Sequence, residues 1–193
     1  MIVLVAGLLL FLGVHSVSIV STAWRDSIAE SIGENAWKGV YSVVALVGFC
    51  LIIYGYGLAR QTPVVLYVPP LWLGYVAIGL MLPAFVMMLS PYFPGRIAST
   101  APHPMLLATK LWGLAHLLAN GMLADVVLFG SFILWAGMDR VSMKRRESRS
   151  IPCLPKSRWN DLILVALGLG IYAAFIGGLH LRLIGMPIGT PWG

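Results

Sequence analysis

Residues 1–20 read MIVLVAGLLLFLGVHSVSIV and include no Asp, Glu, Lys or Arg. A helix of about 20 apolar residues is long enough to cross the hydrocarbon core of a bilayer. The stretch has no basic segment before it and no obvious cleavage site, so we expect a retained transmembrane helix and not a signal peptide. Of the 193 residues, 59% are hydrophobic and 10% are charged, whereas a soluble domain has about 25% charged residues. The sequence therefore predicts an all-α, polytopic integral membrane protein.

Six apolar segments of this kind predict a bundle of about six transmembrane helices, which we expect to form a single domain over residues 1–193. Prolines separate the second span from the third, because proline lacks an amide donor and disfavours a helical residue before it. Asn120-Gly121 is a tight-turn dipeptide, so the fourth and fifth spans are predicted to form a helical hairpin. The predicted spans are about 1–20, 37–58, 71–90, 105–119, 122–139 and 159–183.

Two shorter patterns predict local features. Residues 22–36 mix Arg25 and Glu30 with the apolar Trp24 and Ile28. This mixture predicts a short amphipathic helix at the membrane interface, with a plain polar linker as the alternative. In the last span, small residues recur four positions apart, a spacing that favours close packing against a neighbouring helix. They are Gly170, Ala174 and Gly178.

The basic residues are distributed unevenly between the two sides of the predicted bundle. Of thirteen, Arg60 and Arg182 fall on one side and the other eleven on the opposite side. Lysine and arginine are enriched on the cytoplasmic side, so we expect the 140–158 loop in the cytoplasm and both termini outside it. This clustering explains the net charge of +6 without a nucleic-acid partner. The eleven are Arg25, Lys38, Arg96, Lys110, Arg140, Lys144, Arg145, Arg146, Arg149, Lys156 and Arg158.

Four histidines lie in or beside the predicted spans: His15, His103, His116 and His180. An ionisable side chain inside a span is costly, so a functional role is the default hypothesis; a neutral imidazole bonded to a backbone carbonyl is the alternative. By helical rise, His15 lies roughly 10 Å and His116 roughly 16 Å from the cytoplasmic ends of their spans. Two imidazoles from facing helices can bind a haem iron. We predict His15 and His116 as axial ligands of a haem b, bound non-covalently because the chain has no CxxCH motif.

Other kinds of site have less support in the sequence. The chain has no HExxH motif and no nucleophile elbow, so we expect neither a zinc protease site nor a serine hydrolase. Cys50 lies in an apolar span and Cys153 in the basic loop, so we expect no disulfide. His103 and Lys110 are secondary candidates, since Lys110 either reaches the lipid headgroups or meets a haem propionate. No catalytic residue is predicted.

Several short motifs, taken in order, resemble those of the bacterial NnrU membrane proteins. They extend from the first span to the basic loop. NnrU proteins are associated with denitrification, so the resemblance implies a bacterial inner-membrane protein with periplasmic termini and a redox or accessory role in nitrite and nitric oxide metabolism. The motifs are Val14-His15-Ser16, Ile32-Gly33-Glu34-Asn35-Ala36, His103-Pro104-Met105, Lys110-Leu111-Trp112-Gly113-Leu114-Ala115-His116, Leu128-Phe129-Gly130-Ser131 and Asp139-Arg140.

The same motifs are similar to those of 15-cis-zeta-carotene isomerase, a haem b enzyme that isomerises a carotenoid double bond. This resemblance implies that His15 and His116 are the axial ligands and that a hydrophobic polyene is the substrate. Gly113 stands where that enzyme has a cysteine, so a thiolate ligand switch has no counterpart here. The His-Pro motif also resembles isoprenylcysteine-type methyltransferases, but Pro102 replaces their arginine. A non-enzymatic assembly or transport factor in the lipid bilayer, with an unknown protein partner, is the remaining alternative.

Overall fold

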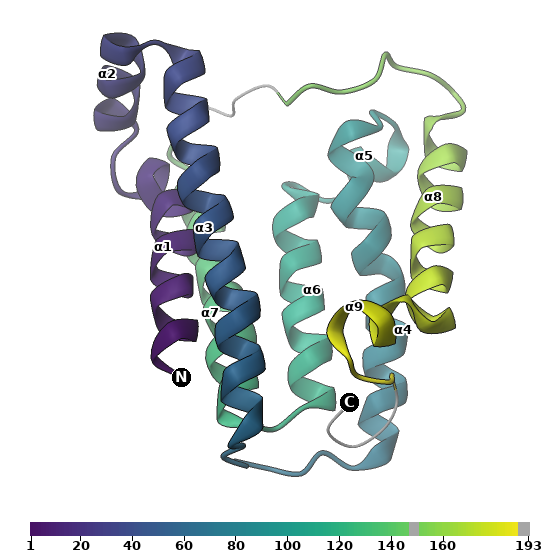
Figure 1. The fold of residues 1–193 in the computed structure, drawn as a ribbon. Coiled ribbons are helices and arrows are strands. Elements are labelled where there is room, and N and C mark those ends of the chain that lie inside the picture. Colours follow the sequence, from purple (N-terminus) through teal and green to yellow (C-terminus); the bar gives the residue numbers. More distant parts are fainter. Residues whose placement is uncertain (147–150, 189–193) are drawn as a thin grey trace. The chain divides into compact units, whose positions relative to one another are not determined.

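The structure, a computed structural model, describes residues 1–146 and 151–188, and every regular element in that part of the chain is helical (Figure 1). Arg149 of the basic loop lies outside these residues. A helix, Leu123–Ser142, occupies the fifth predicted span, and a shorter apolar helix covers Pro104–Ala119. Four further stretches are long and apolar enough to cross a membrane, which confirms the prediction of an all-α membrane protein. They are Ile2–Val20, Glu34–Gln61, Leu71–Tyr92 and Asn160–Ile184.

The described helices form two compact units, and each unit combines separate parts of the chain. Unit 1 contains α1 (Ile2–Val20), α2 (Thr22–Ile32), α3 (Glu34–Gln61) and α7 (Leu123–Ser142). Unit 2 contains α4 (Leu71–Leu89), η1 (Ser90–Tyr92), α5 (Arg96–Thr100), α6 (Pro104–Ala119), α8 (Asn160–Ala174), η2 (Phe175–Leu179) and α9 (His180–Ile184). The expectation of a single domain over residues 1–193 stays a prediction.

In unit 1, α1 packs closely against α3 at three glycines. A Cβ atom at Gly7 would lie 2.6 Å from the backbone nitrogen of Ile52, and one at Gly48 would lie 2.7 Å from the backbone nitrogen of Phe11. A Cβ at Gly55 would collide with the backbone near Leu4. Small residues let helices in a membrane approach to backbone contact, where van der Waals packing holds them together. These glycines therefore bring the residues of α1 close to those of α3.

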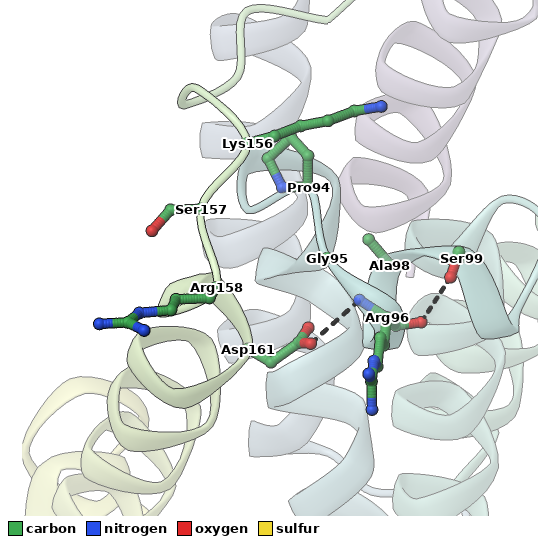
Figure 2. Close-up of a pocket in the computed structure, with 9 residues that line it drawn as sticks. All are labelled: Pro94, Gly95, Arg96, Ala98, Ser99, Lys156, Ser157, Arg158 and Asp161. Carbon is green, nitrogen blue, oxygen red and sulfur yellow. Dashed lines mark hydrogen bonds between the residues drawn. The ribbon is translucent and has the colours of Figure 1, made fainter.

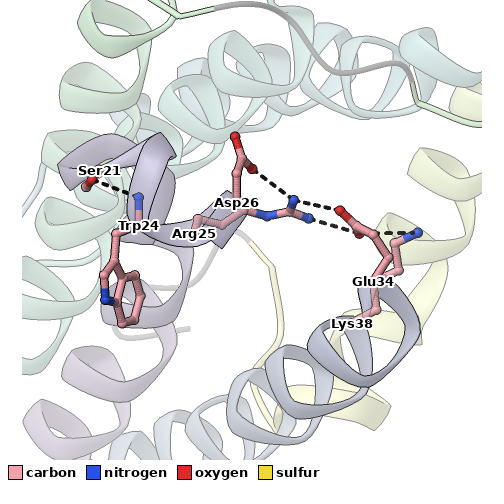
Figure 3. Close-up of polar contacts among 6 residues, drawn as sticks. All are labelled: Ser21, Trp24, Arg25, Asp26, Glu34 and Lys38. Carbon is pink, nitrogen blue, oxygen red and sulfur yellow. Dashed lines mark hydrogen bonds and ion pairs between the residues drawn. The ribbon is translucent and has the colours of Figure 1, made fainter. Parts of the chain in front are cut away.

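The short helix α2 is present between α1 and α3, as the sequence predicts, and its place at the membrane interface stays a prediction. It begins after Ser21, whose hydroxyl oxygen accepts a hydrogen bond from Trp24 N at 3.2 Å (Figure 3). Side chains with this role stabilise the start of a helix. Arg25 joins α2 to the start of α3, because it donates to Glu34 at 2.8 Å. Hydrogen bonding to Glu34 raises the pKa of Arg25 above its usual value.

In unit 2, α4 packs against both α6 and α8. A Cβ at Gly168 of α8 would lie 2.7 Å from a methyl carbon of Val86 on α4, so Gly168 is the small residue at this contact. The predicted stripe of small residues is wrong at two positions, since a Cβ at Gly170 or Gly178 would meet no atom of the described residues within 4 Å. Gly178 has a φ of 121° inside the π-helical segment η2, a conformation that glycine adopts readily. The four-residue spacing of small residues identified a helix that does pack closely, but the contact with α4 is on the face that carries Gly168.

The predicted turn between the fourth and fifth spans is confirmed. Asn120 ends α6, and α7 begins at Leu123. A side chain at Gly121 would collide with the carbonyl oxygen of Tyr67, whose own hydroxyl donates to backbone carbonyls at the end of α6. Since α6 belongs to unit 2 and α7 to unit 1, their packing as a hairpin stays a prediction.

Candidate functional site

His15 lies in α1 among aromatic side chains from three helices of unit 1. Its ring centroid is 4.3 Å from that of Phe11, 5.2 Å from that of Tyr41 on α3 and 6.0 Å from that of Trp135 on α7. The indole ring is perpendicular to the imidazole. His15 is therefore held in a mainly aromatic environment, with one nitrogen bonded to its own helix: Nδ1 lies 2.6 Å from the carbonyl oxygen of Phe11.

Trp135 contributes a polar group to this environment. Its Nε1 atom is buried and has no hydrogen-bond acceptor among the described residues. Buried polar groups in proteins are almost always hydrogen-bonded, and each exception needs an explanation. An acceptor outside the described residues, such as one on a bound group, would satisfy this N–H.

His116, in α6 of unit 2, is bonded to its helix in the same way as His15. Its Nδ1 lies 2.8 Å from the carbonyl oxygen of Trp112, four residues earlier. A carbonyl oxygen only accepts hydrogen bonds, so Nδ1 carries the proton in both histidines. The neutral ring then has its lone pair on Nε2, which is the atom that binds a metal when Nδ1 is fixed by a second-shell partner.

His180 lies beside His116, a pairing that was not predicted from the sequence. Their ring centroids are 6.4 Å apart, and His180 Nδ1 lies 2.8 Å from the carbonyl oxygen of Met186. The signal was present in the sequence: both histidines fall near the ends of their spans that were predicted to lie outside the cytoplasm. The structure thus brings together a histidine pair within unit 2 that differs from the predicted one.

The family model described as NnrU protein matches residues 3–188 of the chain. The chain belongs to the NnrU family. No curated protein and no solved structure matches this NnrU protein. The resemblance to NnrU proteins is therefore confirmed, whereas the similarity to 15-cis-zeta-carotene isomerase stays a prediction.

The predicted pair of axial ligands is divided between the units of this NnrU protein. His15 belongs to unit 1 and His116 to unit 2, so ligation of one iron by both stays a prediction. Of the secondary candidates, His103 caps the start of α6 with a φ of 56°, and its carbonyl accepts from Leu106 N at 3.1 Å. Lys110 is partly buried in α6 and forms no ion pair within the described part of the chain. The described residues contain no group of three or more potential metal ligands.

A buried carboxylate in unit 1 of the NnrU protein was not predicted. Asp125 has no exposed surface, and it accepts hydrogen bonds from the Tyr56 hydroxyl at 2.5 Å and from Met122 N at 2.8 Å. The second bond satisfies one of the orphan amides at the start of α7. Arg60 lies 5.7 Å from the Tyr56 ring and adds a positive charge near the carboxylate. The bond from Met122 N could be predicted, because an aspartate at this position of a helix often accepts from the backbone at the helix start. The bond from Tyr56 on α3 could not, because it depends on how α3 and α7 pack.

Proposed function

We propose that this NnrU protein binds haem b in the bacterial inner membrane and has a redox or accessory role in nitrite and nitric oxide metabolism. His15 and His116 are the candidate axial ligands. The observation that carries the proposal is the environment of His15, where the proton is fixed on Nδ1 and a buried Trp135 N–H has no acceptor among the described residues. The family resemblance supports the connection to nitrogen oxides, and the distribution of basic residues supports a cytoplasmic 140–158 loop with periplasmic termini.

The residues around His15 fit a haem. Phe11, Tyr41 and Trp135 provide flat aromatic surfaces, and the bond from Nδ1 to the Phe11 carbonyl orients the ring and raises the basicity of Nε2. Trp135 would donate its N–H to an acceptor on the bound group. Haem would supply an iron that changes redox state and, if His15 were its single protein ligand, could also take up small ligands such as nitric oxide. The helices would hold this iron away from water and set its potential through the surrounding polarity.

The proposal is tested by purifying the protein in detergent after expression with ample haem and recording the reduced-minus-oxidised absorption spectrum. We expect a Soret band and the sharp α band of a b-type haem. His15→Ala should reduce the retained haem roughly tenfold or more, and His116→Ala should do so if it is the second ligand. His103→Ala tests the secondary candidate, and an unchanged haem content would remove His103 from the site. A wild-type protein without a Soret band overturns the proposal.

Electron paramagnetic resonance of the oxidised protein then separates two forms of the site. Ligation by both His15 and His116 gives a six-coordinate, low-spin iron, and ligation by His15 alone gives a high-spin iron. Trp135→Phe keeps an aromatic side chain but removes the N–H together with the five-membered ring of the indole, so it should weaken haem retention. Trp72→Phe makes the same change at an exposed position of α4 and should not. Equal haem content in these two tryptophan variants would remove Trp135 from the proposed site.

A further inference from the structure

Unit 2 has an open pocket of about 820 Å³ between the end of α4 and the start of α8 (Figure 2). This volume lies in the range of small-molecule sites. Two segments of the chain line the pocket, one running from Pro94 into α5 and the other leading into α8. The lining residues are Pro94, Gly95, Arg96, Ala98, Ser99, Lys156, Ser157, Arg158 and Asp161.

The two lining segments are tied together by hydrogen bonds from buried or partly buried side chains. Asn160 is 3% exposed, and its side-chain amide donates to the carbonyls of Pro94 at 2.9 Å and Pro155 at 3.1 Å. Asp161 accepts from Arg96 N at 3.0 Å and from Ile97 N at 3.1 Å. These bonds fix the pocket walls before any ligand arrives, which lowers the entropy that binding must overcome.

The pocket has an excess of positive charge. Arg96, Lys156 and Arg158 contribute three cations, and Asp161 is the single acid among the lining residues. Both carboxylate oxygens of Asp161 already accept from backbone amides, and within the described residues the three cations form no ion pair. Arg158 lies 5.0 Å from the centroid of the Trp159 ring, a cation–π contact that leaves its charge in place. Figure 2 shows the three charged ends pointing in different directions around the pocket, so no two of them are aimed at one point. Their combined charge attracts an anion, and long side chains of this kind can turn toward it.

The pocket also lies at the level where a membrane meets water. The spanning stretch Leu71–Tyr92 ends just before Pro94, and Asn160–Ile184 begins just after the basic residues of the second wall. Tyr92 is 40% exposed and Trp159 is 53% exposed at these two ends. Exposed tyrosine and tryptophan at the ends of spans mark the headgroup region of a bilayer. An anion at this depth is most simply part of a lipid.

We propose that this pocket binds the phosphate group of an anionic phospholipid headgroup, with the Arg96 and Lys156 side chains turning toward it on binding and Arg158 at the rim. Basic pockets beside transmembrane helices on the cytoplasmic side bind phosphate-bearing headgroups, and the positive-inside pattern assigns this loop to the cytoplasmic side. The lipid's acyl chains would lie along the exposed apolar surface of the neighbouring spans. Free inorganic phosphate has the same charged group without these chains, so it should bind much more weakly.

The test uses the full-length protein in neutral phosphatidylcholine micelles, titrated with phosphatidylglycerol, with lipid retention counted by native mass spectrometry. The double variant Arg96→Gln/Lys156→Gln should retain phosphatidylglycerol roughly 25-fold less tightly, because each basic side chain near an anionic surface contributes about fivefold. The matched control, Lys144→Gln/Arg145→Gln, removes the same charge from two exposed residues outside the pocket and should bind as the wild type does.

Three results would overturn the proposal. An equal loss in both double variants would mean that net charge attracts the lipid and the pocket does not. Equal retention of phosphatidylglycerol and phosphatidylcholine by the wild type would mean that the site does not recognise an anion. Binding of inorganic phosphate alone as tight as binding of phosphatidylglycerol would identify a free phosphate site instead of a lipid site. Circular dichroism of each variant separates a lost site from a lost fold.

Discussion

In unit 1 the backbones of α1 and α3 touch at Gly7, Gly48 and Gly55, whereas in unit 2 the tight contact of α8 with α4 is Gly168 against the side chain of Val86. A side-chain methyl can turn aside, and a backbone atom cannot. Because helix association in a bilayer depends on close packing, the contact of α1 with α3 in unit 1 tolerates added volume less well than the contact of α4 with α8 in unit 2. The helix that carries His15 is thus held against α3 by a contact that leaves little room for added side-chain volume.

The two units also differ in how they use an aspartate at a helix start. Asp125 in unit 1 has no exposed surface, and its partners are the Tyr56 hydroxyl and a backbone amide. Asp161 in unit 2 is partly exposed at the rim of the basic pocket, and both of its partners are backbone amides. Water can replace Asp161 and cannot replace Asp125, so the same residue type has a different energetic weight in each unit.

The largest expected effect comes from the buried aspartate. Asp125→Ala leaves the Tyr56 hydroxyl and Met122 N without an acceptor, and each orphaned group costs about 1–3 kcal/mol. We expect the free energy of unfolding to fall by about 3 kcal/mol, against about 1 kcal/mol for Asp161→Ala. Thermal unfolding in detergent, followed by circular dichroism, measures both. Equal losses would show that the two capping sites do not differ in burial as described.

A smaller difference is expected between glycines. Gly7→Ala places a Cβ against the backbone of Ile52 and should cost about 2 kcal/mol. Gly168→Ala meets a methyl carbon of Val86 at 2.7 Å and the Val86 backbone at 3.1 Å, slightly farther than the backbone at Gly7, and should cost about 1 kcal/mol. Gly13→Ala is the control on α1, because its Cβ would meet nothing within 4 Å and alanine favours a helix. The same unfolding assay applies, and destabilisation by Gly13→Ala would contradict this explanation.

The smallest effect is expected at the junction of α2 and α3. Arg25→Gln removes the ion pairs with Asp26 and Glu34, whose side chains are 47% and 53% exposed. Exposed ion pairs contribute about 0–1 kcal/mol, so global stability should change by about 0.5 kcal/mol. Hydrogen exchange should quicken in α2 and stay unchanged in α1. Faster exchange throughout unit 1 would mean that this contact supports more than the local junction.

Much of the fold was predictable because a bilayer sets a length and composition that each spanning helix must satisfy. The spans, the turn at Asn120-Gly121 and the short helix after Ser21 followed from local signals. The pairs of helices that pack together could not be predicted from local signals, because several helix faces contain glycine and the sequence does not show which of them meets a neighbour. Gly170 and Gly178 had the expected spacing, yet Gly168 makes the contact.

The candidate site was also predictable only in part: the position of His15 was, and its contacts were not. The position of His15 inside a span followed from hydropathy, and its proximity to Tyr41 and Trp135 depended on the packing of α1 with α3 and α7. The ion pair of Asp139 was not predicted. Its described partner is Arg146, which lies beyond the end of α7. A contact of this kind depends on the path that the chain takes after the helix, and no periodic pattern in the sequence indicates that path.

Unit 1 is built from two separate parts of the chain, so its contacts cannot all form at the same time during synthesis. Tyr56 and Asp125 form one hydrogen bond but stand 69 residues apart, with α4 and α6 translated between them. At about 5–20 residues per second, a ribosome takes roughly 3–14 s to cover that distance. During this interval α1 and α3 have been synthesised, but the Tyr56 hydroxyl does not yet have Asp125 as its acceptor. The hydrogen bond between Tyr56 and Asp125 can therefore form only after α7 has been made.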